Sequence, residues 1–139
     1  MTLALLFLPF TELLARALTR IYRPQAPARF GPRYLDPRAI ATPPLAFGLA
    51  TREFQRMCDI VGEMLEQSLS ALERDDLELI EAIEARDDQV DILNREIRFF
   101  LAGLGEETMT AEQAARQMNL ITLTADLENA GDTINKNLL

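Results

Sequence analysis

A repeat of apolar residues after residue 42 limits the fold of this chain more than any other feature. Apolar or small residues recur there at intervals of three and four, the spacing of a helix packed in a bundle. These positions are Phe47, Ala50, Phe54, Met57, Val61, Met64, Ser68 and Ala71. Thr42 is a suitable N-cap, and Pro43 and Pro44 suit a first helical turn, where no backbone donor is lost. We therefore expect a helix that begins at Pro43 and ends near Arg74.

A second helix is predicted after a turn at Asp75 and Asp76, and it should end near Leu101. Its inward positions again follow the helical spacing. They are Leu79, Ile83, Val90, Leu93, Ile97, Phe100 and Leu104. Gly103 and Gly105 follow, and we expect them to close the helix in the left-handed conformation that glycine tolerates.

A third helix should begin near Ala111, because Thr110 and Gln113 match the capping box in which each satisfies a backbone donor of the other. Its leucine stripe is Leu120, Leu123, Leu127, Ile134 and Leu138. Short connections join the three long helices, and we find no strand pattern. The sequence therefore predicts an all-α fold, an up-down-up three-helix bundle.

The first 42 residues form two different segments. Residues 1–22 begin with an uncharged apolar run, Leu3 to Phe10, about half of the ~20 residues that a membrane span needs. We interpret them as the end of a transmembrane or membrane-associated helix, and a soluble amphipathic helix is the alternative. Residues 23–42 form a Pro/Arg-rich linker, because their prolines exclude a long helix or an interior strand. The helical domain then occupies residues 43–139.

Charge also divides the chain into two parts. Residues 1–58 carry eight arginines against three acidic residues, a net charge of +5, whereas residues 59–139 carry six basic and nineteen acidic residues, a net charge of −13. The basic, apolar start suggests a membrane surface, and its arginines fit the cytoplasmic side of a span. The acidic part suggests metal ions or basic partners and argues against nucleic acid.

The residue types argue against an enzyme. Histidine, the usual acid–base catalyst, is absent from the chain. We find no glycine-rich phosphate loop and no nucleophile motif, so we predict neither catalytic nor cofactor-binding residues. The single cysteine, Cys58, lies beside the apolar stripe and is interpreted as structural.

Pairs of carboxylates four residues apart recur on the second and third predicted helices. Asp87 with Asp91, and Glu128 with Asp132, each share one helix face because residues i and i+4 lie one above the other. Like charges at this spacing repel unless a cation or an opposite charge is supplied. Carboxylates without histidine or thiolate favour hard cations such as Mg²⁺, Ca²⁺, Mn²⁺ or ferric iron. A solvated acidic face that only keeps the bundle soluble is the alternative.

The position of the third-helix pair affects the kind of site that we expect. Glu128, Asp132 and Asn135 fall opposite the leucine stripe on a helical wheel. We therefore expect a surface cluster shared with another repeat, not an enclosed site. Gly131, between the pair, costs the helix about 1 kcal/mol relative to alanine, so we expect it to serve close packing or the close approach of an ion cluster.

Two acidic segments resemble the PhoU repeat. They are EARDDQVDILNREI at residues 84–97 and LENAGD at residues 127–132, and the resemblance covers about residues 45–139. The segments at residues 5–10 and 36–46 resemble the junction between the membrane core and the PhoU-like tail of bacterial sodium/phosphate cotransporter family proteins. The family binds multinuclear metal clusters through an acid-x-x-x-Asp motif. In this sequence the motif falls at Asp87 with Asp91, at Glu128 with Asp132 and, less closely, at Glu84 with Asp88.

The resemblance implies a cytoplasmic regulatory domain on an inner-membrane, sodium-dependent phosphate transporter, where it would sense or adjust phosphate uptake. Its partners would be the membrane and the transporter core of the same parent chain, and a homo-oligomer is left open. Only one of the two repeats of the family is present, and the third helix runs to residue 139 without a stop signal. The resemblance therefore implies a segment of a longer protein.

Two other functions stay open at this point. One is a free-standing PhoU-like regulator of phosphate signalling that binds metal, which would require Met1 to be the true start. The other is a purely structural helical adaptor. Membrane fractionation separates the transporter domain from the free-standing regulator, and a metal titration separates both from the adaptor.

Overall fold

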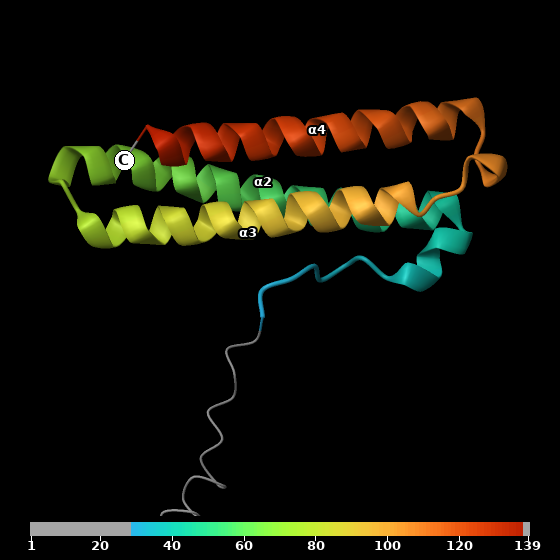
Figure 1. The fold of residues 1–139 in the computed structure, drawn as a ribbon, viewed down its shortest axis with the longest axis horizontal. Coiled ribbons are helices and arrows are strands. Elements are labelled where there is room, and N and C mark those ends of the chain that lie inside the picture. The colour runs from blue at the N-terminus through green and yellow to red at the C-terminus, as the bar shows by residue number, and fades with distance from the viewer. Residues whose placement is uncertain (1–28, 138–139) are drawn as a thin grey trace, which may run out of the picture.

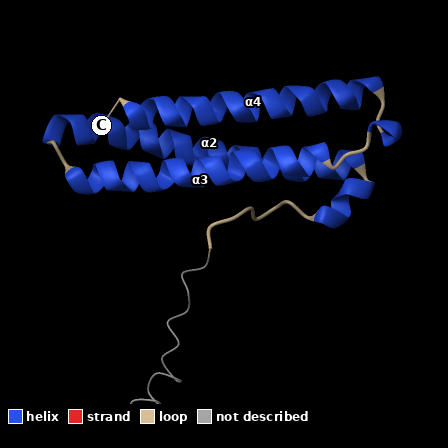
Figure 2. Cartoon of the chain, viewed as in Figure 1, coloured by secondary structure: helices blue, strands red, loops and turns tan. Residues whose placement is uncertain are grey.

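A computed structural model describes residues 29–137 of the chain as a bundle of three long helices (Figure 1). In chain order the elements are the 3-10 helix η1 (Pro37–Ala41), α2 (Pro43–Arg74), α3 (Leu77–Ala102), the 3-10 helix η2 (Glu106–Thr108) and α4 (Ala111–Lys136). This described part contains no β-strand, so the all-α prediction is confirmed (Figure 2).

The helices are arranged up, down and up, as predicted. A short turn joins α2 to α3 at one end of the bundle, and the loop with η2 joins α3 to α4 at the other end (Figure 1). Each long helix packs against both of the others, and η1 packs against α2. The three helices therefore share one core.

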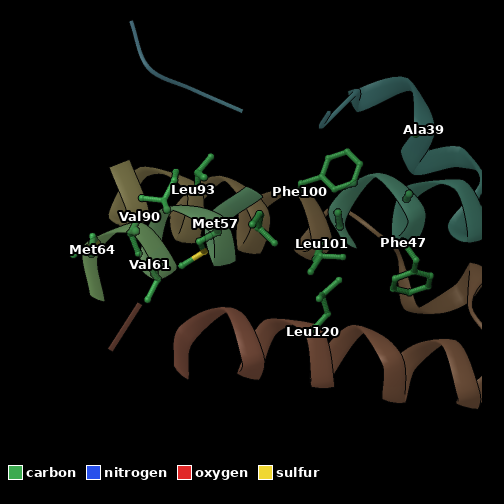
Figure 3. Packing of buried hydrophobic residues seen from close by; sticks show 14 of the residues in the cluster. Ala39, Phe47, Met57, Val61, Met64, Val90, Leu93, Phe100, Leu101 and Leu120 are labelled. Carbon is green, nitrogen blue, oxygen red and sulfur yellow. The ribbon is translucent and has the colours of Figure 1, made fainter. Parts of the chain in front are cut away.

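That core is an apolar seam between the helices, shown from close by in Figure 3. The side chains of Phe47, Met57 and Met64 from α2 are at most 1% exposed, and those of Leu93 and Leu101 from α3 are fully buried. Full burial of a side chain of this size stabilises the folded state by about 1.5–3 kcal/mol. The seam between α2 and α3 is therefore the main source of stability.

The apolar pattern predicted the inner faces of α2 and α3 well. Among the predicted positions, only Phe54 and Leu79 are partly rather than fully buried. The pattern missed four buried residues, which are Ala46, Glu53, Ile60 and Leu101. Three of these are apolar neighbours of the predicted stripe, whereas the burial of a glutamate has a separate cause, described below.

Particular residues set the helix ends. Asp75 ends α2 in the left-handed conformation, with φ of 51°. The side chain of Asp76 then accepts hydrogen bonds from two backbone amides in the first turn of α3. At the start of α4, the capping box of Thr110 and Gln113 is present with both of its hydrogen bonds, as predicted.

The prediction that Gly103 and Gly105 adopt the left-handed conformation is wrong. Their φ angles are −71° and −70°, values that any residue adopts. Gly103 instead allows η1 to approach the end of α3. A Cβ atom at Gly103 would lie 3.0 Å from Ile40 Cδ1 and 3.2 Å from the carbonyl oxygen of Phe100. The glycine is needed for space, not for its backbone freedom.

Helix α4 turns most of its predicted leucine stripe to the core, but the stripe is wrong at Leu123. Leu123 is 52% exposed, whereas Leu120, Thr124 and Gly131 are buried. Thr124 tolerates burial because its hydroxyl donates a hydrogen bond of 2.7 Å to the carbonyl oxygen of Leu120. Thr124 and Gly131 therefore occupy inward positions of α4, and Leu123 stays outside.

The described part of the linker, residues 29–42, is held against α2 by a buried carboxylate. Glu53 is fully buried, and its Oε2 accepts hydrogen bonds of 2.8 Å from the backbone amides of Arg33 and Tyr34. Its Oε1 accepts a hydrogen bond of 2.7 Å from Arg56. A buried charge is tolerated when it is paired and hydrogen-bonded in this way. Periodicity alone does not reveal this contact.

Residues 1–28 and 138–139 lie outside the described part. The prediction of a membrane helix at residues 1–22, the first part of the linker, and Leu138 of the leucine stripe therefore stay predictions. No helix within residues 29–137 is both long enough and apolar enough to cross a membrane.

The face of α4 can be tested with a matched pair of leucines on that helix. Leu120→Ala should lower the free energy of unfolding by about 2–5 kcal/mol, because it leaves a cavity in the core. Leu123→Ala should lower it by less than about 1 kcal/mol, because that side chain is half exposed. Urea denaturation of both variants measures the difference. Equal losses would show that α4 is rotated from the orientation described here.

Candidate carboxylate site between α3 and α4

The four carboxylates predicted as metal ligands lie together where α4 packs against α3. Asp87 and Asp91 occupy consecutive turns of α3, and Glu128 and Asp132 occupy consecutive turns of α4. The carboxyl groups of Asp91 and Glu128 lie close enough across the interface for each to shift the pKa of the other. These four side chains are called the carboxylate cluster below.

The expectation that Glu128 and Asp132 face away from the other helices is wrong. Thr124 and Gly131 are buried, and residues four apart share a helix face, so Glu128 is brought to the interface one turn after Thr124. Glu128 and Asp132 are both half-buried, while Asp91 stays exposed. The cluster therefore lies at the rim of the core, between two helices of the same bundle.

Asp87 connects the cluster directly to α4. Its Oδ2 accepts a hydrogen bond of 2.7 Å from Nδ2 of Asn135. Its Oδ1 is buried and has no hydrogen-bond donor within the described residues, and the same holds for Oδ1 of Asn135. Buried oxygens without a partner cost free energy. Two such oxygens beside a carboxylate cluster are atoms that a cation would satisfy.

Gly131 lies where α4 comes closest to Asp87. A Cβ atom at this position would lie 3.4 Å from Asp87 Oδ1, 3.6 Å from Val90 Cγ1 and 3.7 Å from Val61 Cγ2. These are ordinary contact distances, so alanine would fit but would cover the unpartnered oxygen of Asp87. Gly131 therefore lies beside the cluster as expected, but these distances do not show that close packing requires a glycine there.

The environment of the cluster favours protonation of two of its members. Although Asp91 is exposed, partial desolvation of its carboxyl group beside α4 raises its pKa, and the charges of Asp87, Asp88 and Asp132 raise it further. Burial also raises the pKa of Glu128, as do the charges of Asp91, Asp132 and Asp87. The contact between the two groups lowers the pKa of Asp91 and raises that of Glu128. The pair therefore holds a proton more readily than ordinary carboxyl groups do.

One cation of the chain already lies at the edge of the cluster. Lys136 forms an ion pair with Asp132 one turn earlier on α4. The hydrogen bond to Asp132, followed by the charge of Asp132, raises the pKa of Lys136. This pair is exposed, so it contributes little to stability. It lowers the local negative charge without occupying the interface.

The weaker motif pair does not join the cluster as a pair. Asp88 is exposed on α3 and acts on the cluster only through its charge, which raises the pKa of Asp91. Glu84 is half-buried one turn before Asp88 and makes no hydrogen bond or ion pair within the described residues. The structure therefore separates the two strong motif pairs from the weak one.

The chemistry of the cluster fits a hard cation. Carboxylate and amide oxygens are the ligands that Mg²⁺, Ca²⁺ and Mn²⁺ prefer, and a hard cation binds about six to eight of them. Asp87, Asp91, Glu128 and Asp132 supply carboxylate oxygens, and Asn135 supplies an amide oxygen. Within residues 29–137, no three cysteine or acidic side chains are already arranged around a common metal position.

Sequence reasoning missed the roles of Asn135 and Lys136. Asn135 was placed with Glu128 and Asp132 on one face, but its hydrogen bond to Asp87 joins residues 48 positions apart. A helical wheel describes one helix at a time, so it cannot show such a contact. The spacing of Lys136 four residues after Asp132 is the signal that could have identified the ion pair.

The PhoU domain family matches residues 54–137, which include most of α2 and all of α3 and α4. A protein named "Putative inorganic phosphate export protein YjbB" from Salmonella typhimurium is 32% identical to this chain over 134 residues. Its namesake from Escherichia coli K12 is 29% identical over 134 residues. In both, the match covers 95% of this chain and 24% of the relative, so the chain spans about a quarter of the length of these curated relatives. No solved structure matches the chain.

The raised pKa values of Asp91 and Glu128 predict how stability depends on pH. A carboxyl group whose pKa is raised by folding stabilises the folded state below its unfolded pKa, and this contribution is lost as pH rises through the folded pKa. Unfolded values are about 3.9 for Asp and 4.3 for Glu. The contribution of the pair to stability should therefore fall as pH rises above about 4.

Glu128→Gln keeps a hydrogen-bond donor to Asp91 at every pH and removes one negative charge. This variant should be more stable than the wild type at pH 7, and its advantage should shrink as pH approaches about 4. Thermal unfolding of both proteins across this range measures the difference. Asp126→Asn, which changes an exposed carboxylate of α4 outside the cluster, is the control. If the stability of the wild type and that of Glu128→Gln changed in parallel with pH, the raised pKa of Glu128 would be contradicted.

Proposed function

Because this chain belongs to the PhoU domain family, we propose that it is the regulatory domain of a bacterial transporter of inorganic phosphate. The family match carries this proposal, since it covers α3 and α4, the two helices that form the carboxylate cluster. The names of the curated relatives, which refer to inorganic phosphate export, support the phosphate substrate. Transport itself is the task of a membrane core outside these residues, and this domain adjusts it without being an enzyme.

The domain works at the cytoplasmic face of the inner membrane. The apolar and arginine-rich residues before the bundle support this location, because basic residues accumulate on the cytoplasmic side of a span. Its partners are the membrane and the transporter core. The resemblance to sodium/phosphate cotransporter proteins favours coupling to sodium. That resemblance implies uptake and the relatives are named for export, so we propose control of phosphate flux with its direction left to measurement.

The carboxylate cluster is the part of the domain that responds to cations in the cell. Asp87, Asp91, Glu128 and Asp132 hold a hard cation, Mg²⁺, Ca²⁺, Mn²⁺ or ferric iron, which supplies the positive charge that four carboxylates lack. Without it, the repulsion among the carboxylates raises the pKa of Glu128 and is relieved only in part, by Asn135 and Lys136. Because the two carboxylate pairs belong to different helices, the charge state of the cluster sets how firmly α4 packs against α3.

Cation binding can be measured on the isolated chain. Mg²⁺ or Mn²⁺ should raise the melting temperature, because a ligand that binds only the folded state stabilises it by mass action. Replacing Asp91 and Asp132 by asparagine should abolish this rise. The apo form of the double variant should be at least as stable as the wild type, because two repelling charges are removed.

The matched control carries Glu81→Gln and Asp126→Asn. It removes the same charge from exposed positions on α3 and α4 outside the cluster, so it should keep the cation response of the wild type. If both double variants lost the response equally, the cation would be screening total charge and not binding the cluster. If the wild type showed no response, the cluster would be only a solvated acidic face, as expected of a structural adaptor.

The regulatory function requires a measurement in the parent bacterium. Membrane fractionation should recover the wild-type chain, within its parent protein, with the inner membrane. Asp91→Asn with Asp132→Asn should change the rate of radiolabelled phosphate flux, measured with and without a sodium gradient, at an unchanged amount of membrane-bound protein. Recovery in the soluble fraction would favour the free-standing regulator. Unchanged flux in the variant would contradict control through the cluster.

A further inference from the structure

The surface formed by the linker and the first half of α2 is chemically unlike the carboxylate cluster. A hollow of about 340 Å³ opens there between the two segments. It is lined by Arg33, Tyr34, Arg52, Gln55, Arg56 and Asp59. We call it the arginine hollow. A second hollow of about 330 Å³ shares Arg33 and Arg56 with it and adds Arg29.

The charge of the arginine hollow is opposite to that of the domain. Residues 29–137 contain 11 basic and 21 acidic residues. The hollow nevertheless gathers three arginines against one lining carboxylate, Asp59, and Arg29 lies in the adjoining hollow. The nearby carboxylate of Glu53 is fully buried and already paired with Arg56. A positive surface on an acidic domain attracts anions selectively.

Two arginines of the hollow have guanidinium groups available for a ligand. Within the described residues, the side chains of Arg33 and Arg52 form no ion pair and donate no hydrogen bond. Arg56 differs, because it donates to Glu53 at 2.7 Å and to the carbonyl oxygen of Gly31 at 3.0 Å. Arg56 therefore builds the hollow, while Arg33 and Arg52 face a possible ligand with unused donors.

The hollow is held in shape before any ligand binds. The buried carboxylate of Glu53 fixes the backbone of Arg33 and Tyr34 through two hydrogen bonds of 2.8 Å. The guanidinium carbon of Arg52 lies 5.1 Å from the centre of the Tyr34 ring, a cation–π contact that restrains its long side chain. Side chains ordered in advance lose less entropy when a ligand binds.

From these contacts we propose that the arginine hollow binds a phosphate group, either free inorganic phosphate or the phosphate of an anionic lipid headgroup. Guanidinium groups donate planar, paired hydrogen bonds that match phosphate oxygens, and such charge-assisted bonds are the strong ones. A phosphate group of either kind carries negative charge on several oxygens, so it can accept hydrogen bonds from both free arginines at once. The site is separate from the carboxylate cluster and does not depend on the cation proposed there.

The test uses the full chain and inorganic phosphate as the probe. Isothermal titration at constant ionic strength, with chloride as the reference anion, should show saturable binding by the wild type. Replacing Arg33 and Arg52 by glutamine should weaken it about tenfold or more, as expected when charge-assisted hydrogen bonds are lost. The control variant replaces Arg74 and Arg98 by glutamine. These arginines are exposed and lie outside the arginine hollow, so this variant should bind phosphate like the wild type.

A second arm uses vesicles of phosphatidylcholine with and without phosphatidylglycerol, and flotation measures binding of the same three proteins. If inorganic phosphate does not bind, but the Arg33 and Arg52 variant alone loses affinity for the phosphatidylglycerol vesicles, the ligand is a lipid headgroup. Equal losses in the hollow variant and the control variant would overturn the proposal, because only total charge would matter. Unchanged binding of both probes by the hollow variant would also overturn it. Circular dichroism melts establish that each variant is folded.

Discussion

The bundle depends on how little apolar surface α4 brings to the core. Ten residues of α2 and six of α3 are buried, but only Leu120, Thr124 and Gly131 are buried on α4. Hydrophobic burial scales with the apolar area removed from water, so α2 and α3 hold each other firmly and α4 is attached more weakly. In its second half, α4 packs through the partly buried Leu127 and Ile134, and it also meets α3 through Asn135 and the carboxylate cluster. The attachment of this helix is therefore sensitive to charge.

This arrangement gives the carboxylates a physical effect that a solvated acidic face would not have. Charges on opposite sides of an interface change the free energy of bringing its two helices together, whereas charges on one exposed face change it little. Two contacts reduce the repulsion in this chain: the amide of Asn135 on Asp87, and Lys136 beside Asp132. A bound cation would add a third. Each would shift the equilibrium between tight and loose packing of α4. Such a shift can transmit the effect of a local change in charge to a partner.

The sequence predicted most of the fold because α2 and α3 bury apolar residues at regular spacing, and local motifs such as the Thr110–Gln113 box act within one turn. Prediction from the sequence failed where contacts between segments far apart in the chain decide which residues are buried. The leucine stripe of α4 was wrong at Leu123, because the inward position is taken by Thr124, whose hydroxyl is satisfied within the helix. Gly103 was expected to close α3 in the left-handed conformation, but it makes room for Ile40. Spacing identified the four carboxylates, and only the packing of α4 against α3 brings the two pairs together.

The central claim is that the charge state of the carboxylate cluster controls how firmly α4 packs against α3. Hydrogen exchange of backbone amides, followed with and without Mn²⁺, tests it most directly, because exchange reports local opening of each helix. The amides of residues 124–136 in α4 should become more protected when Mn²⁺ is added, while those in the first half of α2 should change little. Protection that rises equally throughout the bundle, or does not rise in α4, would contradict the claim.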